Sequence, residues 1–119
     1  MKEEIEVYHN PRCSKSRSAI SFLDKENYSV NVVEYLKQTL TFDELVVLLK
    51  KLKMEAKDLV RKGEEDYKNN FKGKELSENE WIDAMVKYPK LIERPIVVFG
   101  ENAIVARPTE KIEELLNNF

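Results

Sequence analysis

The chain has only one cysteine, Cys13, among its 119 residues. Without a second cysteine no intrachain disulfide can form, and a single reduced thiol is typical of proteins from reducing compartments. The chain also lacks an apolar run long enough to cross a bilayer. Residues 1–6 are acidic and lack the apolar stretch of a secretory signal. We therefore expect a cytoplasmic protein that does not interact with membranes.

An excess of charge of one sign is missing as well. The chain has 20 lysine and arginine residues against 22 aspartate and glutamate residues, which leaves a formal net charge of -2. This balance gives no overall attraction to nucleic acid, so any anion site must be built locally. The sequence shows no internal repeat, low-complexity tract or linker, and a chain of this length can bury its own core. We expect a single domain over residues 1–119, and we expect it to be monomeric.

The first third of the chain has the hydrophobic pattern of a βαβ unit. Residues 5–8 are predicted as a short strand, residues 14–27 as a helix with one apolar face, and residues 28–35 as a β-branched strand. Such a crossover is nearly always right-handed, and its two strands are parallel. Cys13 is therefore expected beyond the carboxyl end of the first strand, where α/β folds usually bind ligands.

The middle of the chain is predicted to be helical. Thr41 with Glu44, and Ser77 with Glu80, form capping boxes that precede apolar residues at helical spacing. Between these two helices, residues 55–61 predict a short helix. The polar residues 62–75 are compatible with either a loose helix or a mobile loop.

The last quarter of the chain predicts a ββα unit. Residues 95–99 and 103–106 are apolar and flank the turn at residues 100–102, which indicates a hairpin of two buried strands. A final helix is predicted from Pro108. This order of elements resembles a thioredoxin-like α/β fold, with a four-stranded mixed sheet and a helical insertion between the βαβ and ββα units.

Cys13 is a candidate nucleophile because it is expected at a helix start. Unpaired backbone N–H groups and the positive end of the helix dipole favour a thiolate there. Arg12, Lys15 and Arg17 lie beside it in the sequence and add positive charge. The competing interpretation is a small buried thiol without reactivity, but such thiols are not usually flanked by three cations at a helix start.

Two polar neighbours of Cys13 have open roles at this point. Ser16 is one helical turn further on, so its hydroxyl could bond the thiolate or cap a backbone N–H. His9 is the only histidine of the chain. It is either a strand-end side chain without a role or an imidazolium that lowers the thiol pKa further.

Three arginines form a second pattern. Arg61, Arg94 and Arg107 would each be read alone as solvated surface residues. However, two Arg-Pro pairs bracket the predicted hairpin, so Arg94 and Arg107 are expected at the same end of the sheet as Cys13. Guanidinium groups match tetrahedral oxyanions, so an arginine cluster over a thiolate indicates a site for an anion that the thiolate attacks.

Several separated motifs closely resemble one family, the glutaredoxin-coupled arsenate reductases or ArsC family, which has a thioredoxin-like fold. The motifs are Val7-Tyr8-His9-Asn10-Pro11-Arg12-Cys13, Leu59-Val60-Arg61-Lys62, Trp81-Ile82-Asp83-Ala84-Met85, Arg94-Pro95-Ile96-Val97-Val98 and Ala106-Arg107-Pro108. One small departure is Gly63, which stands where the pattern has asparagine. The resemblance covers nearly the whole chain.

The resemblance implies a role for each candidate residue. Cys13 is implied as nucleophile, Ser16 as the serine that bonds the thiolate, and His9 as the histidine that helps to lower the thiol pKa. The implied oxyanion ligands are Arg61, Arg94 and Arg107, and the accessory candidates are Asn10, Arg17 and Pro95. Thioredoxin-like folds carry a cis proline beside the active thiol, so the resemblance implies a cis bond before Pro95 as well.

The resemblance also implies a mechanism. Arginines hold arsenate while the Cys13 thiolate displaces an oxygen at arsenic, and glutathione then attacks the adduct, so that arsenite leaves and Cys13 remains in a mixed disulfide. Since the chain has no second cysteine, an external glutaredoxin must release Cys13. The implied partners are arsenate, glutathione and glutaredoxin, with no metal and no bound cofactor.

Two alternatives remain within this fold. One is a glutathione-dependent thiol reductase of the same family with a substrate other than arsenate. The other is an Spx-like transcription-regulatory binding protein, although such proteins usually carry Cys-x-x-Cys and lack the arginine found here as Arg107. A phosphatase-like reductase would need an arginine six positions after the cysteine, where this chain has Ala19. Dithiol oxidoreductase activity is excluded because Ser16 occupies the place of a second cysteine.

Overall fold

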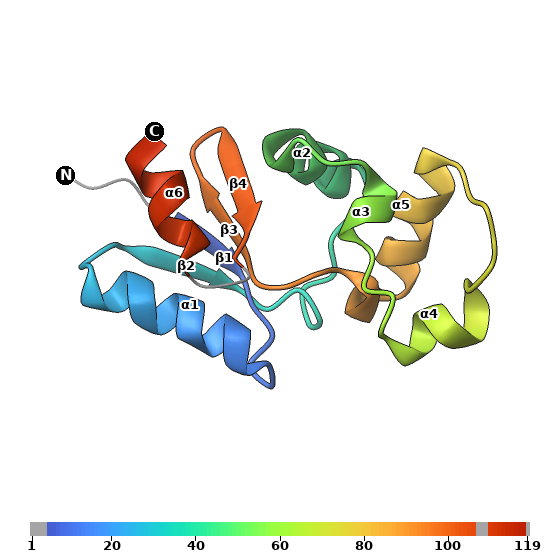
Figure 1. Ribbon diagram of the computed structural model, residues 1–119, viewed down its shortest axis with the longest axis horizontal. Helices are drawn as coiled ribbons and strands as arrows, with labels where there is room; N and C mark the ends of the chain where they lie inside the picture. Colours follow the sequence, from blue (N-terminus) through green and yellow to red (C-terminus); the bar gives the residue numbers. More distant parts are fainter. Residues whose placement is uncertain (1–4, 107–109, 119) are drawn as a thin grey trace. The chain divides into compact units, whose positions relative to one another are not determined.

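The computed structural model describes residues 5–106 and 110–118 of the chain. Its internal contacts divide it into two compact units (Figure 1). Thr39–Glu93 form the second unit, and the described residues on either side of that segment form the first. The second unit is therefore the helical insertion expected between the βαβ and ββα parts of the sequence.

The first unit contains a four-stranded mixed sheet. Its strands are β1 (Ile5–Tyr8), β2 (Val30–Val33), β3 (Ile96–Phe99) and β4 (Asn102–Val105), in the order β2-β1-β3-β4. The central strand β1 is parallel to β2 and antiparallel to β3, and β3 and β4 form an antiparallel hairpin. The predicted βαβ unit, hairpin and four-stranded mixed sheet are confirmed.

Two helices complete the first unit, α1 (Ser14–Lys25) and α6 (Lys111–Asn118). Both contribute to one apolar core with the sheet, because alternate residues of a strand and residues four apart in a helix share a face. The fully buried residues of this core are Ile5, Val7, Ala19, Leu23, Val97, Ala106, Ile112 and Leu115. Through Ala19 and Leu23 this core packs α1 against the strands of the sheet, and through Ile112 and Leu115 it does the same for α6.

Two elements of the first unit are shorter than predicted. The strand expected over residues 28–35 is limited to Val30–Val33, which pair with the described residues of β1 from Ile5 opposite Val30 to Tyr8 opposite Val33. The helix expected over residues 14–27 ends at Lys25, since Asn27 has a left-handed φ of 62° and closes a turn. The start of the last helix at Pro108 lies outside the described residues.

The second unit is helical. It contains α2 (Phe42–Leu52), α3 (Ala56–Leu59), α4 (Glu65–Asn70), α5 (Glu78–Lys87) and the 3-10 helix η1 (Pro89–Leu91). Both predicted capping boxes are present: the Thr41 and Ser77 hydroxyls accept from Glu44 N at 3.1 Å and Glu80 N at 3.2 Å. The two glutamate side chains accept in return from the cap residues' N–H groups. The sequence signal therefore located both helix starts.

The structure also decides between the alternatives left open for residues 62–75. This segment contains the six-residue helix α4 between two stretches without regular structure. Tyr67 at its centre stacks on Trp81 of α5 with ring centroids 6.3 Å apart, and Phe71 lies 5.7 Å from the same ring. Contacts between aromatic rings therefore tie α4 to α5.

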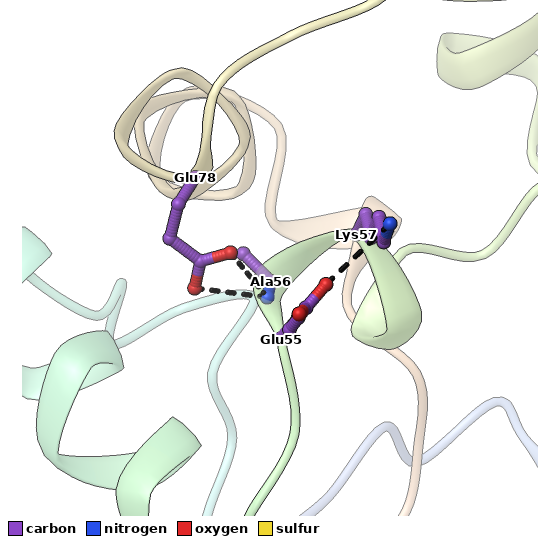
Figure 2. Close-up of polar contacts among 4 residues, drawn as sticks. All are labelled: Glu55, Ala56, Lys57 and Glu78. Carbon is purple, nitrogen blue, oxygen red and sulfur yellow. Dashed lines mark hydrogen bonds and ion pairs between the residues drawn. The ribbon is translucent and has the colours of Figure 1, made fainter.

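A carboxylate of α5 fixes the start of the short helix α3. Figure 2 shows that both side-chain oxygens of Glu78 accept from the N–H of Ala56, each at 3.0 Å. This N–H belongs to the first residue of α3 and has no partner within the helix. The neighbouring ion pair of Glu55 with Lys57 is 3.5 Å long, and its side chains are 67% and 63% exposed.

We expect Glu78→Ala to lower the free energy of unfolding by about 1 kcal/mol, because it removes a charge-assisted hydrogen bond to an otherwise unpartnered N–H. Chemical denaturation measures this change. Glu55→Ala is the matched control, since an ion pair between exposed side chains contributes little to stability. Equal effects of the two substitutions would contradict a specific role for Glu78.

Candidate active site

Cys13 lies in the loop that connects β1 to α1, at the N-cap position of α1. Its backbone is extended, with φ -96° and ψ 121°, and the helix begins at Ser14. Asn10 shapes the loop: its carbonyl oxygen accepts from Cys13 N at 2.9 Å, and its side-chain oxygen accepts from Arg12 N at 3.0 Å. The predicted place of the thiol, at a helix start beyond the carboxyl end of β1, is confirmed.

Ser16 faces the thiol through its backbone. Its main-chain N–H is hydrogen-bonded to Cys13, as expected for an N–H of a first helical turn. Its side chain is fully buried, and the hydroxyl oxygen accepts from Asn10 N at 3.3 Å. The Ser16 hydroxyl therefore accepts a hydrogen bond from a backbone N–H, as in the predicted capping role, and this bond holds the loop in place.

Arg94 reaches the thiol from the segment that leads into the neighbouring strand β3. The register pairs Tyr8 with Ile96, so the residues just before β3 lie at the sheet end where the chain leaves β1. The Arg94 side chain is hydrogen-bonded to Cys13. The peptide bond between Arg94 and Pro95 is cis, as predicted, and the Pro95 carbonyl accepts from Ala106 N at 2.9 Å.

These contacts determine the acidity of the thiol. Burial, the largest single influence, raises the pKa of Cys13, but the N–H of Ser16, the side chain of Arg94 and the N–H of Lys15 lower it by hydrogen bonding. The positive charge of Arg94 lowers it further, and the net result is a Cys13 pKa below the ordinary thiol value. The site therefore favours the thiolate, the nucleophilic form of cysteine.

Of the two sources of positive charge that the sequence indicated, the structure confirms Arg94 at the Cys13 end of the sheet and does not bring the flanking guanidinium groups to the sulfur. Arg12 is exposed, and the Arg17 guanidinium donates to Pro11 O at 2.9 Å. Lys15 acts on the thiol through its backbone N–H. The cation that hydrogen-bonds to the sulfur is Arg94, which is 81 positions away in the sequence and is brought there by the pairing of β1 with β3.

His9 is buried directly after β1, and its main-chain N–H donates to Val33 O at 2.8 Å. Among the residues that the structure describes, its ring Nδ1 has no hydrogen-bond partner. The pKa of His9 is lowered, and burial is the main cause. The negative charge of Glu34 raises this pKa, whereas the positive charge of Arg17 lowers it further. A neutral imidazole is therefore favoured near pH 7, and the lowered thiol pKa does not require a charged His9.

The other two candidate arginines are placed differently. Arg61 belongs to the second unit, where its Nε lies 3.0 Å from a carboxylate oxygen of Glu93. Arg107 lies outside the described residues. Within the first unit, the structure brings together Cys13, Ser16 and Arg94.

In residues 5–106 and 110–118, no three metal-binding side chains of histidine, cysteine, aspartate or glutamate come together. None of the helices described is both long and apolar enough to cross a bilayer.

The sheet order, the cis proline before β3 and the cysteine at the start of α1 define the thioredoxin-like class of proteins. Within this class, the family model of the ArsC family matches residues 8–115. The chain therefore belongs to the ArsC family.

Known relatives match nearly the full length of the chain. It is 42% identical over 118 residues to the uncharacterized protein YfgD of Escherichia coli, with 98% of this chain and 99% of that protein covered. It is 37% identical over 115 residues to an arsenate reductase of Neisseria meningitidis, with 95% and 98% covered. The solved structure of an arsenate reductase from Vibrio cholerae superposes with a TM-score of 0.91 at 37% identity, covering 96% of this chain and 98% of that one.

Proposed function

We propose that this chain is a single-domain arsenate reductase that works in the cytoplasm with glutathione and glutaredoxin. The observation that carries the proposal is the Cys13 thiol, whose pKa is lowered at a helix start and which is hydrogen-bonded to Arg94. A thiolate beside a guanidinium suits attack on an oxyanion, because the arginine binds the anion and offsets its repulsion of the sulfur. Family membership and relatives named as arsenate reductases support arsenate as that oxyanion.

In the first chemical step, the Cys13 thiolate attacks arsenic(V). A sulfur–arsenic bond forms, one arsenic–oxygen bond breaks, and the oxygen leaves as water after protonation. Arg94 stabilises the negative charge that builds up on the remaining oxygens. Neutral His9 and the loop residues Asn10 and Ser16 hold the nucleophile in place, since their contacts fix the segment between β1 and α1.

The second step supplies the electrons. A glutathione thiolate attacks the Cys13 sulfur, the pair of electrons of the sulfur–arsenic bond passes to arsenic, and arsenite with arsenic(III) leaves. Cys13 remains in a mixed disulfide with glutathione. Because Cys13 is the only cysteine of the chain, a glutaredoxin thiol must take the glutathionyl group and restore the free thiol.

The remaining arginines complete the proposal. On the family resemblance we assign Arg61 and Arg107 as further ligands of the oxyanion, and Arg17 and Pro95 as accessory residues that support the loop and the entry to β3. The guanidinium of Arg17 supports the loop through its bond to Pro11 O. The protein is proposed to act as a monomer without a bound cofactor.

The test is a coupled assay of purified protein with arsenate, glutathione, glutaredoxin, glutathione reductase and NADPH. We expect NADPH oxidation that depends on arsenate, and formation of arsenite in equal amount. Folded protein that forms no arsenite would overturn the arsenate assignment. If such a protein still forms the Cys13–glutathione disulfide with another oxidant, the family thiol reductase with a different substrate is favoured, whereas an unreactive Cys13 favours the binding-protein alternative.

A further inference from the structure

The backbone of the second unit places Arg61 and Glu93 on the same face of two paired segments. Val60 and Ile92 form an isolated antiparallel β-bridge. Hydrogen bonds on both sides hold it, from Arg61 N to Leu91 O at 2.7 Å and from Glu93 N to Leu59 O at 2.9 Å. Since alternate residues of extended chains point to opposite faces, Arg61 and Glu93, each one residue beyond the bridge, extend from the same face.

Their side chains form a short ion pair. Arg61 Nε lies 3.0 Å from Glu93 Oε1, and the side chains are 22% and 29% exposed. A hydrogen bond of this length to a partly buried carboxylate fixes the plane of the guanidinium, because Nε is part of that plane. Nη1 of the same fork is buried and, within the described part of the chain, has no hydrogen-bond partner, so the guanidinium keeps donor capacity that the protein itself does not use.

A second carboxylate is near the same guanidinium but does not hold it. Glu64 Oε2 lies 4.0 Å from Arg61 Nη1, which is beyond hydrogen-bond length, and its side chain is 23% exposed. One positive and two negative charges leave this cluster with one excess negative charge. An anion that binds Arg61 must therefore overcome the charge of both glutamates, although only Glu93 orients the guanidinium.

We propose that Glu93 is a positioning residue for Arg61, whose guanidinium plane it fixes through Nε. This inference rests on the proposed function, in which Arg61 binds the arsenate oxyanion. Glu64 has the opposite effect, because its charge weakens anion binding without orienting the guanidinium. The sequence offered one signal for this arrangement, since Glu93 directly precedes the Arg94-Pro95 pair, but charge alone would have suggested that Glu93 repels the substrate.

The substitutions separate orientation from charge. Glu93→Gln removes the negative charge and keeps an oxygen that can accept from Nε, whereas Glu93→Ala removes both. We expect Glu93→Ala to raise the KM for arsenate about tenfold with little change in kcat, and Glu93→Gln to leave KM within about twofold of the wild type. Glu64→Gln, the matched control, should lower KM about twofold, since an opposing charge is lost.

The kinetics are measured in the coupled assay, and arsenate affinity is measured by calorimetry in the Cys13→Ser background, where no turnover occurs. Thermal melting confirms that each variant is folded. If Glu93→Ala is unstable, Glu93→Gln still tests the inference, because a tenfold rise in the KM of Glu93→Gln overturns it. A fall in KM for Glu93→Ala overturns it too, because charge alone would then explain Glu93.

Arg61→Ala separates this inference from the proposed function. The inference is supported if Arg61→Ala raises the KM for arsenate and Glu93→Ala raises it by a smaller amount. If the wild-type protein reduces arsenate but Arg61→Ala has an unchanged KM, the positioning role is overturned and the proposed function stands. If the wild-type protein neither reduces nor binds arsenate, the proposed function fails and this inference fails with it.

Discussion

Cys13→Ser should abolish arsenate reduction in the coupled assay, with a loss of roughly a thousandfold or more, because the hydroxyl is not ionised near neutral pH and cannot replace the thiolate. The chain has no other sulfur nucleophile of this kind, since Cys13 is its only cysteine. The effect is expected in kcat rather than in binding, because serine keeps the backbone N–H groups and the helix start unchanged.

Two measurements complete this test. Ser18→Ala is the control, since Ser18 is an exposed residue of the same helix and its loss should leave the rate unchanged. Mass spectrometry of the wild-type protein after arsenate and glutathione without glutaredoxin should show one added glutathionyl group on Cys13. Turnover by Cys13→Ser, or an adduct elsewhere in the wild type, would refute the role of this thiol.

Arg94→Ala is expected to have the second largest effect, a fall in kcat/KM of about a hundredfold, which is typical for loss of one donor that stabilises a developing oxyanion. The same substitution should raise the pKa of Cys13, because it removes both the hydrogen bond and the positive charge that Arg94 directs at the sulfur. Among the described residues, burial, which raises the pKa of Cys13, would then be opposed by the backbone N–H groups of Ser16 and Lys15.

The pH dependence of alkylation with iodoacetamide measures this shift. In the wild type the rate should stay high as the pH falls below about 8.5, the ordinary thiol value, and drop only when the pH passes the lowered pKa of Cys13. In Arg94→Ala the drop should occur at higher pH. Arg12→Ala removes an exposed arginine next to the cysteine and should leave the profile in place, and equal shifts in both variants would contradict a specific role for Arg94.

Most of the fold could be predicted from local signals in the sequence. The capping boxes at Thr41 and Ser77 marked two helix starts correctly, because a cap depends on residues only three positions apart. The strand β1 and the hairpin of β3 and β4 were also recognised, since their apolar residues follow one another in the chain. The extent of β2 was wrong, because a strand ends where its partner ends, and the partner β1 is remote in sequence.

The candidate site was predictable to a smaller extent. Sequence placed Cys13 at a helix start and a cis bond before Pro95, and both are confirmed. The carboxylates around Arg61 were missed, because the β-bridge between Val60 and Ile92 that aligns Glu93 with Arg61 joins segments more than thirty residues apart. Glu64 is close to Arg61 in sequence, but its distance from the guanidinium depends on where α4 begins.

The sequence by itself determined that this protein has a single thiol, at the start of a helix, and hence that any thiol redox cycle must use electrons from another molecule. The sequence also placed Arg94 at the same end of the sheet as Cys13, but only the tertiary structure shows that Arg94, rather than the cationic side chains beside Cys13 in the sequence, bonds to the thiol. The arginines beside Cys13 in the sequence are either exposed to solvent or bonded to a backbone oxygen. Arg94 reaches the thiol because the pairing of β1 with β3 brings together segments that are far apart in the chain. Helix-dipole effects act over one turn of chain, whereas the position of a charge in space depends on the whole sheet.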